Sequence, residues 1–249
     1  MNTDRSKSLL PPRARLLAFL ALAICHLSPV AVKIGSGAQG KENPELQRIF
    51  LQMEAAGRNF RSFEAKISEK KYTAVLKEFG TAQTGEFYLA RAKDGSTMMR
   101  QDISSPGRVI LTIKGDLLTR YWPNLKEAQV ANLGKHKDKA AELLALGIGR
   151  PPTDMQKSYD ISYQGEESVG GVACSVLVLK PKNPQAAALY TTIVWWVDKS
   201  TGIPIQHKLQ ELSNDYLLVT FSNEKLNSKI PDSKFEQKLP NDVKVQRLQ

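Results

Sequence analysis

Histidine and cysteine, which are common in catalytic and metal sites, are scarce in this chain of 249 residues. None of the three histidines, His26, His136 and His207, has a second histidine, a cysteine or a carboxylate at ligand spacing on its own predicted element. The sequence therefore predicts no zinc site. It also contains no nucleophile elbow. We expect a protein that is not an enzyme and that needs no metal or cofactor.

The two cysteines give no basis for an internal disulfide, because Cys25 lies in a segment that we expect to be removed. Residues 5–15 carry four basic side chains, and residues 16–24 are apolar but too short to span a bilayer, which is typical of a secretory signal. We assign residues 1–38 to a cleaved signal peptide and leader, with an uncleaved membrane anchor as the main alternative. Lipidation at Cys25 is a further alternative, which Ile24 disfavours because a small residue normally precedes an acylated cysteine. Cys174 is then the remaining thiol, and its apolar strand indicates a buried side chain rather than a nucleophile.

A concentrated patch of positive charge is missing too, although the formal net charge is +10. The basic residues are spread over the predicted strands, which argues against a nucleic-acid groove. Residues 35–41 fit the spacing GxxxxGK, but Glu42 stands where a phosphate-binding loop needs Ser or Thr for magnesium. We therefore expect neither a nucleic-acid partner nor a nucleotide site of this kind.

The most informative stretch is 193–205, which reads IVWWVDKSTGIPI and predicts a β-hairpin. Asp198 and Gly202 supply turn chemistry between two extended runs, and we interpret Asp198 as a turn residue rather than a catalytic acid. The side chains that alternate along the first run are apolar on both faces. A sheet with two apolar faces must be covered by other elements or must enclose an apolar guest.

Two segments, residues 44–56 and 135–146, have the period of a helix instead of a strand. Asn43 can cap the first of them and Gly57 can close it. Its apolar stripe consists of Leu46, Ile49, Phe50 and Met53. The second segment combines helix formers with an apolar stripe of its own. Both helices therefore have a face that must lie on the sheet.

Most of the chain after residue 62 alternates in the manner of strands joined by Gly, Pro and Asp turns. The pattern is clearest where Phe63, Ala65 and Ile67 alternate with polar residues. We predict one domain over residues 39–249 that is built on an antiparallel meander. The predicted strands are 63–68, 72–79, 84–92, 98–103, 108–113, 117–122, 159–163, 172–179, 191–197, 203–211 and 216–223. The segment 235–248 closes the chain, with a turn at residues 240–242 before Val243 and Val245.

Four groups of residues resemble, in their order along the chain, the periplasmic outer-membrane lipoprotein carriers, the LolA family. The likeness covers nearly all of residues 44–248. The groups are Ser62, Phe63 and Ala65 after the first helix; Pro106, Gly115, Tyr121 and Pro123; Trp196, Val197, Asp198, Thr201, Gly202 and Pro204; and Phe235, Pro240, Val243 and Val245.

The resemblance implies an α+β fold in which one antiparallel sheet forms an incomplete, half-open β-barrel with a helical lid on its concave face. It assigns residues 44–56 and 135–146 to the lid. It also implies a periplasmic monomer whose partners are an acylated lipoprotein or lipid, an inner-membrane release complex and an outer-membrane acceptor. In the family, an arginine on an early strand, followed by proline, helps to set the lid and release the cargo. Here Ala92 follows Arg91, and Arg91 or Arg100 is the candidate for that role.

On this basis we expect a carrier that shields acyl chains of lipoproteins or other lipids for transfer to the outer membrane. The alternatives are a periplasmic sensor of an anti-sigma factor pathway and an accessory protein of a lipid exporter. Such sensors carry an additional C-terminal domain, and this sequence ends soon after its last predicted strand, which favours the carrier. The side chains expected to line the cavity are Phe63, Ile67, Phe87, Leu89, Leu111, Ile113, Leu217, Val219 and Phe221, with Leu143 and Leu144 from the lid.

Overall fold

The computed structural model describes residues 43–134 and 147–248. The described residues all belong to one compact unit, Glu42–Gln249. The signal peptide and leader predicted for residues 1–38 lie outside the described residues. So does the predicted lid helix 135–146, with Leu143 and Leu144.

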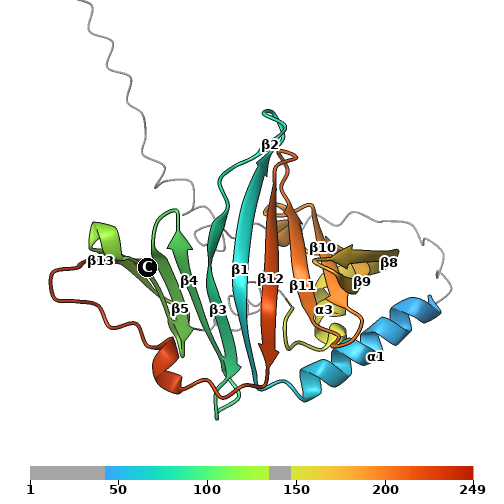
Figure 1. Cartoon of the computed structure of the whole chain (residues 1–249), viewed down its shortest axis with the longest axis horizontal. Helices are drawn as coiled ribbons and strands as arrows, with labels where there is room; N and C mark the ends of the chain where they lie inside the picture. Colours follow the sequence, from blue (N-terminus) through green and yellow to red (C-terminus); the bar gives the residue numbers. More distant parts are fainter. Residues whose placement is uncertain (1–42, 135–146, 249) are drawn as a thin grey trace, which may run out of the picture. The chain divides into compact units, whose positions relative to one another are not determined.

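Thirteen strands of the described residues form one sheet, in the order β13-β7-β6-β5-β4-β3-β1-β12-β11-β10-β9-β8, with β2 paired to β1 alone (Figure 1). All paired strands are antiparallel except β13 and β7. The sheet starts at β13 and ends at β8, so it is not closed. The strands are β1 (Ser62–Thr73), β2 (Glu78–Phe79), β3 (Gln83–Arg91), β4 (Thr97–Ser105), β5 (Val109–Lys114), β6 (Leu117–Trp122), β7 (Glu127–Asn132), β8 (Tyr159–Val169), β9 (Val172–Pro181), β10 (Thr192–Asp198), β11 (Pro204–Gln210), β12 (Tyr216–Leu226) and β13 (Lys244–Leu248).

The helix α1 (Pro44–Arg58) forms where the sequence predicts it. The side chain of Asn43 accepts a hydrogen bond from the backbone N–H of Glu45, which satisfies one of the donors left free at a helix start. Gly57 does not close the helix as expected. It lies inside α1, where a Cβ would come within 3.3 Å of the backbone of Arg150, so its small size serves a close approach rather than a cap.

The predicted hairpin is the pair β10 and β11, with Trp195 opposite His207. Asp198 accepts hydrogen bonds from the backbone and hydroxyl of Ser200 and from the hydroxyl of Thr201. These bonds fix the turn, which confirms the turn role assigned to this carboxylate. The open, mostly antiparallel sheet with helices against it confirms the predicted α+β fold of an incomplete barrel.

Several elements differ from the prediction. A helix that the sequence does not predict, α3 (Pro152–Ser158), opens at Pro152, a position in which the missing N–H of proline is harmless. The strand β7 forms where the sequence predicts no strand, and it buries a small residue on each face, Ala128 on the outer and Ala131 on the inner. The predicted strand 72–79 turns back after Thr73, so that β2 pairs with β1. The remaining short elements are α4 (Pro184–Ala187), η3 (Pro123–Leu125) and η5 (Asp232–Phe235).

The two faces of the sheet bury different clusters. The larger, which we call the inner-face cluster, joins ten strands from β7 to β9 in sheet order with side chains of α1 and α3. Its buried sheet residues are Phe63, Ala65, Ile67, Phe87, Leu89, Met99, Ile103, Ile113, Leu118, Ala131, Leu177, Leu179, Ile193, Trp195, Val197, Leu209, Val219 and Phe221. The outer face carries two smaller clusters, one around Tyr88 and Phe235 and one around Ile110 and Tyr121.

Candidate functional site

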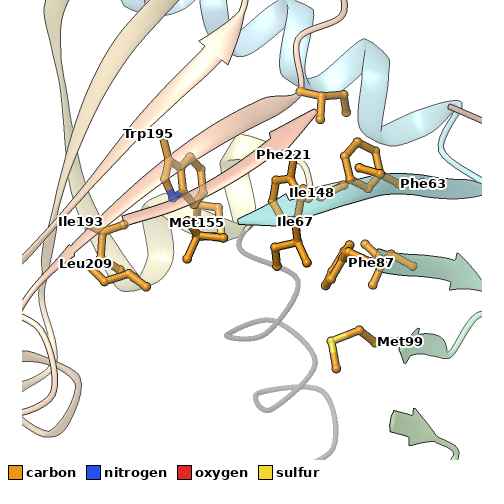
Figure 2. Close-up of a cluster of buried hydrophobic side chains, with 14 of the residues drawn as sticks. Phe63, Ile67, Phe87, Met99, Ile148, Met155, Ile193, Trp195, Leu209 and Phe221 are labelled. Carbon is orange, nitrogen blue, oxygen red and sulfur yellow. The ribbon is translucent and has the colours of Figure 1, made fainter. Parts of the chain in front are cut away.

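The cavity residues predicted from the sequence lie together on the inner face. Of the eleven, the nine that fall within the described residues all belong to or pack against the inner-face cluster. Leu111 and Leu217 are partly buried, and the other seven are buried. Figure 2 shows Phe63, Ile67, Phe87 and Phe221 gathered from neighbouring strands. The faces assigned from alternation are therefore right, whereas the binding role of these residues stays a prediction.

Aromatic rings form the middle of this cluster. The ring of Phe221 lies 5.4 Å from that of Phe63 and 5.0 Å from that of Phe87, in edge-on or tilted contact. His207 is fully buried beside them, with its ring edge-on to Trp195 and Phe221. Its neighbours make it a packing residue in an aromatic layer. Among the described residues there is no group of three His, Cys, Asp or Glu that could hold a metal ion.

The inner face is covered by α1, α3 and the loop 147–151 between them in space. Ile49 and Met53 of α1, Ile148 of the loop and Met155 of α3 are buried in the inner-face cluster, and Figure 2 shows Met155 near Trp195. Within the described part of the chain, the inner face is thus filled by the protein's own side chains. A guest on this face has to replace part of the cover.

Two glycines let the loop lie tightly on the inner face. Gly147 has a φ of +78°, and a Cβ there would stand 2.2 Å from the ring of Trp195. Gly149 has a φ of +71°, and its Cβ would stand 2.6 Å from the ring of Phe60. Both the backbone conformation and the space therefore require glycine.

The helix α1 is held mainly by packing. Gln52 donates one hydrogen bond of 3.2 Å to the carbonyl of Lys199 in the β10–β11 turn. In the same turn, a Cβ on Gly202 would stand 2.8 Å from the carbonyl oxygen of Gln52. Beneath this contact lies a surface hollow of about 310 Å³, lined by α1 residues and by turn residues such as Thr201. Beside the Gln52 hydrogen bond, the buried side chains of Ile49 and Met53 attach the cover by non-directional contacts, which favour reversible displacement.

One end of the inner face is polar. The Nε2 of Gln101 donates a 2.9 Å hydrogen bond to Glu69, and the two side chains meet above Gly85, which has no side chain of its own. Burial raises the pKa of Glu69, and the Gln101 bond and the charge of Arg120 only partly oppose this. Burial lowers the pKa of Arg120, whose guanidinium lies 4.8 Å from the centre of the Trp122 ring.

Arg120 has no carboxylate within ion-pair distance among residues 43–134 and 147–248. A partly buried guanidinium is stabilised by an anion that accepts its five donors.

The two arginines considered for lid release lie in different places. Arg91, at the end of β3, donates a 3.4 Å hydrogen bond to the carbonyl of Gly149 in the covering loop. Arg100 lies on the outer face, where it pairs with Asp102 at 2.9 Å and reaches the carbonyl of Lys234. Arg91 thus contacts the cover and Arg100 does not, and the release role of each stays a prediction.

Sequence reasoning missed part of the site. Trp195, Ile193 and Leu209 belong to the inner-face cluster, and their alternation is visible in the sequence, but the prediction does not assign them to the cavity. Ile148 and Met155 are missed because the sequence does not predict that the loop and α3 cover the sheet. The meeting of Glu69 and Gln101 depends on the sheet order, which no local pattern reveals.

Comparisons with known proteins agree with this architecture. A protein family whose description reads "-like: Uncharacterized protein" matches residues 152–229. No curated protein sequence matches the chain. Among solved structures, MucB is similar with a TM-score of 0.51 and 15% identity over 79% of this chain and 64% of MucB. An uncharacterized conserved protein from Thermus thermophilus has a TM-score of 0.53 and 11% identity over 82% of this chain and 99% of its own.

The chain therefore has the fold of these two structures and spans about two thirds of the length of MucB. MucB has also been solved in complex with MucA(peri). A LolA superfamily protein from Nitrosomonas europaea is similar with a TM-score of 0.36 and 14% identity, over 77% of this chain and 97% of that protein. Within residues 43–134 and 147–248, no helix has the length and hydropathy needed to cross a bilayer.

Proposed function

We propose that this protein is a periplasmic carrier that shields the acyl chains of lipoproteins, or of other lipids, on the inner face of its open sheet. One observation carries the proposal. The inner-face cluster is continuous across ten strands and is covered by helices that are held mainly by packing. Such a face offers acyl chains a non-directional apolar surface once the cover moves.

The energetics favour a carrier of this kind. Each methylene exposed to water costs about 0.8 kcal/mol, so a chain of about fifteen methylenes is opposed by roughly 12 kcal/mol when it crosses an aqueous space unshielded. An acyl chain that replaces Ile49 and Met53 of α1 on the cluster restores apolar contacts of the same type. Displacing the cover is therefore largely compensated by binding the guest.

The partly exposed residues of the inner face indicate where a guest would enter. Leu111 and Leu217 are the predicted cavity residues that stay partly exposed, and they offer an apolar chain its first contacts. Arg120 lies opposite Leu111 on the neighbouring strand. It would pair with an anionic group at the head of the guest, as a guanidinium does with carboxylate or phosphate. In this proposal the partners are an inner-membrane complex that loads the guest and an outer-membrane acceptor that removes it.

Lipid analysis tests the proposal directly. We expect mass spectrometry of protein isolated from its native envelope to find a bound acylated molecule, and a fluorescent fatty acid to bind the emptied protein. L111D should weaken this binding at least about tenfold, because it places a charge on the apolar face. The control is L117D, on the outer side of the adjacent strand, where Leu117 is exposed. Protein without lipid, together with no uptake of the probe, would rule the carrier out.

A sensor that binds a partner protein is the second candidate, and the similarity to MucB favours it. In this case the lipid would control access to the partner rather than travel as cargo. Affinity isolation from a cross-linked envelope separates the two. A carrier releases its lipid to an acceptor membrane, whereas a sensor retains it and gains or loses a stable protein partner.

A further inference from the structure

Two adjacent turns at one end of the sheet expose large apolar side chains. Val75 and Leu76, in the turn between β1 and β2, are 86% and 62% exposed. Leu212, between β11 and β12, is 68% exposed, and Phe79 of β2 is 46% exposed. Figure 1 shows both turns side by side at the end of the sheet marked by β2. We call residues 74–79 and 211–215 the tip.

The tip is a built structure. The backbone N–H of Ala74 donates a 2.8 Å hydrogen bond to Asp215, which joins the two turns. Beneath them, the Tyr72 ring stacks on the Tyr216 ring at 4.7 Å, and the Phe79 ring packs against both. The exposed apolar side chains are thus held outward on an aromatic base, rather than carried by a loop free to fold them in.

The lysines around the tip, Lys70, Lys71, Lys77 and Lys208, outnumber its carboxylates, Glu78, Glu211 and Asp215, by one. Lys71 pairs with Glu211 and lies 3.9 Å from Asp215. Lys70 and Lys77 are exposed and have no carboxylate within ion-pair distance in the described part of the chain. In addition, Lys208 lies 4.3 Å from the centre of the Tyr216 ring, and Glu78 is the exposed acidic residue of the tip.

We propose that the tip docks this protein on an anionic phospholipid surface by inserting Val75, Leu76 and Leu212 shallowly among the acyl chains. Phe79, Tyr72 and Tyr216 suit the headgroup level, where amphipathic rings gather, and lysines beside them meet anionic headgroups. The apolar area of four side chains is far below the roughly 1,200 Å² of a stable protein interface. A small exposed apolar point with lysines beside it fits a membrane surface better than a protein partner.

The proposal does not depend on carriage. It concerns the outer turns, whereas the acyl chains of the proposed function would lie on the inner face. A protein that binds no lipid on its inner face can still dock through the tip, and a carrier can lack membrane docking. The experiment therefore reads the environment of the tip alone.

Local fluorescence on the full chain tests the docking. An environment-sensitive dye is attached to L212C, with L51C on α1 as the matched control, since Leu51 is 66% exposed and lies far from the tip in sequence. Cys25 is replaced by Ser, while Cys174 is kept because it is fully buried. Burial also raises the pKa of its thiol to about 11, which keeps it unreactive.

Vesicles that contain phosphatidylglycerol should shift the emission of the dye at position 212 to the blue, and brominated acyl chains should quench it. The dye at position 51 should show neither effect. Equal behaviour at both positions would overturn the proposal. So would a blue shift at position 212 without vesicles, because it would mean that a second copy of the chain covers the tip.

Substitutions provide a second readout. In the L212C-labelled protein, L76D should weaken the vesicle response at least about tenfold, because a carboxylate replaces an inserted leucine. K70E combined with K77E should weaken it by a smaller factor that disappears in high salt. L51D should leave the response unchanged. A response that survives L76D would contradict insertion of the tip.

Discussion

The inner and outer faces of the sheet differ in the continuity of their buried apolar clusters. The inner face buries one cluster that runs across ten strands, whereas the outer face buries two separate clusters. The outer clusters are each closed by the chain after β12, which brings Phe235 against Tyr88 and Leu239 against the cluster around Ile110. The chain therefore covers its outer face locally, at two separate clusters. It leaves the inner face as one uninterrupted apolar surface under packed helices.

The largest expected effect comes from truncating the middle of the inner face. F221A should destabilise the protein by about 3–5 kcal/mol, because Phe221 is buried and contacts the rings of Phe63, Phe87 and His207. F235A on the outer face should cost less, about 2–3 kcal/mol, since its smaller cluster can collapse more easily. Urea unfolding measures both. Equal losses of unfolding free energy in the two variants would show that the two faces are packed alike.

A substitution in the covering loop 147–151 should destabilise the protein almost as much as F221A. G147A should destabilise by about 2–4 kcal/mol, because it strains a positive φ and drives a Cβ into the Trp195 ring. The control is G95A, where φ is +83° but no atom lies within 4 Å of the added Cβ. It should cost only about 1 kcal/mol. A G147A loss no larger than the G95A loss would mean that the loop is not pressed on the inner face.

The two faces should also differ in their response to pH, through one carboxylate on each. Burial alone would raise the pKa of Asp102 on the outer face, but hydrogen bonds and charges from Arg108 and Arg100 outweigh it and lower the pKa. A lowered pKa contributes stability that is complete above the unfolded pKa and is lost as pH falls through the folded one. D102N should therefore destabilise by about 2 kcal/mol near pH 7 and by much less at about pH 2.

Thermal unfolding of the D102N variant across this pH range measures the effect. R108Q is the matched change, because it removes one of the two arginine partners of Asp102. It should destabilise the protein less than D102N does at neutral pH, because Arg100 still reaches Asp102. A loss of stability in D102N that stays constant down to about pH 2 would contradict the lowered pKa of Asp102.

The smallest expected effect is a stabilisation, and it concerns a carboxylate on the inner face. Glu69 has a raised pKa because of burial, so its charged form is penalised in the folded state. That penalty is absent below the unfolded pKa and grows as pH rises through the folded pKa. E69Q should therefore stabilise the protein by about 1 kcal/mol near pH 8 and by almost nothing near about pH 4. Thermal unfolding against pH tests this, and a destabilised E69Q protein at pH 8 would show that the charge is favourably paired.

Local patterns were sufficient to predict the faces of the strands. Phe63, Ala65 and Ile67 alternate with polar residues because one face of β1 is buried and the other is wet, and this period survives any error in the strand ends. The stripe of α1 was equally clear, since Ile49 and Met53 are buried as predicted.

What escaped prediction depends on contacts between distant segments. The sequence EAQVAN of β7 alternates too weakly to distinguish a strand from a linker, and only pairing with β6 and β13 decides it. The glycines at 147 and 149 indicate turns, but their contact with Trp195 and Phe60 requires the folded sheet. For the same reason, no pattern around Arg120 indicates that it lies at the polar end of the inner face.

An unclosed sheet leaves β8 as a border strand, and this border is poorly suited to accept another strand. The register of β8 with β9 shifts between Tyr163 and Gly165, where φ reaches +113°, so the strand is bulged near its middle. Glu166 and Glu167 follow directly and are exposed. A bulge is one way in which proteins prevent intermolecular β-pairing. Addition of a strand from a second copy is therefore disfavoured at the β8 border of the open sheet.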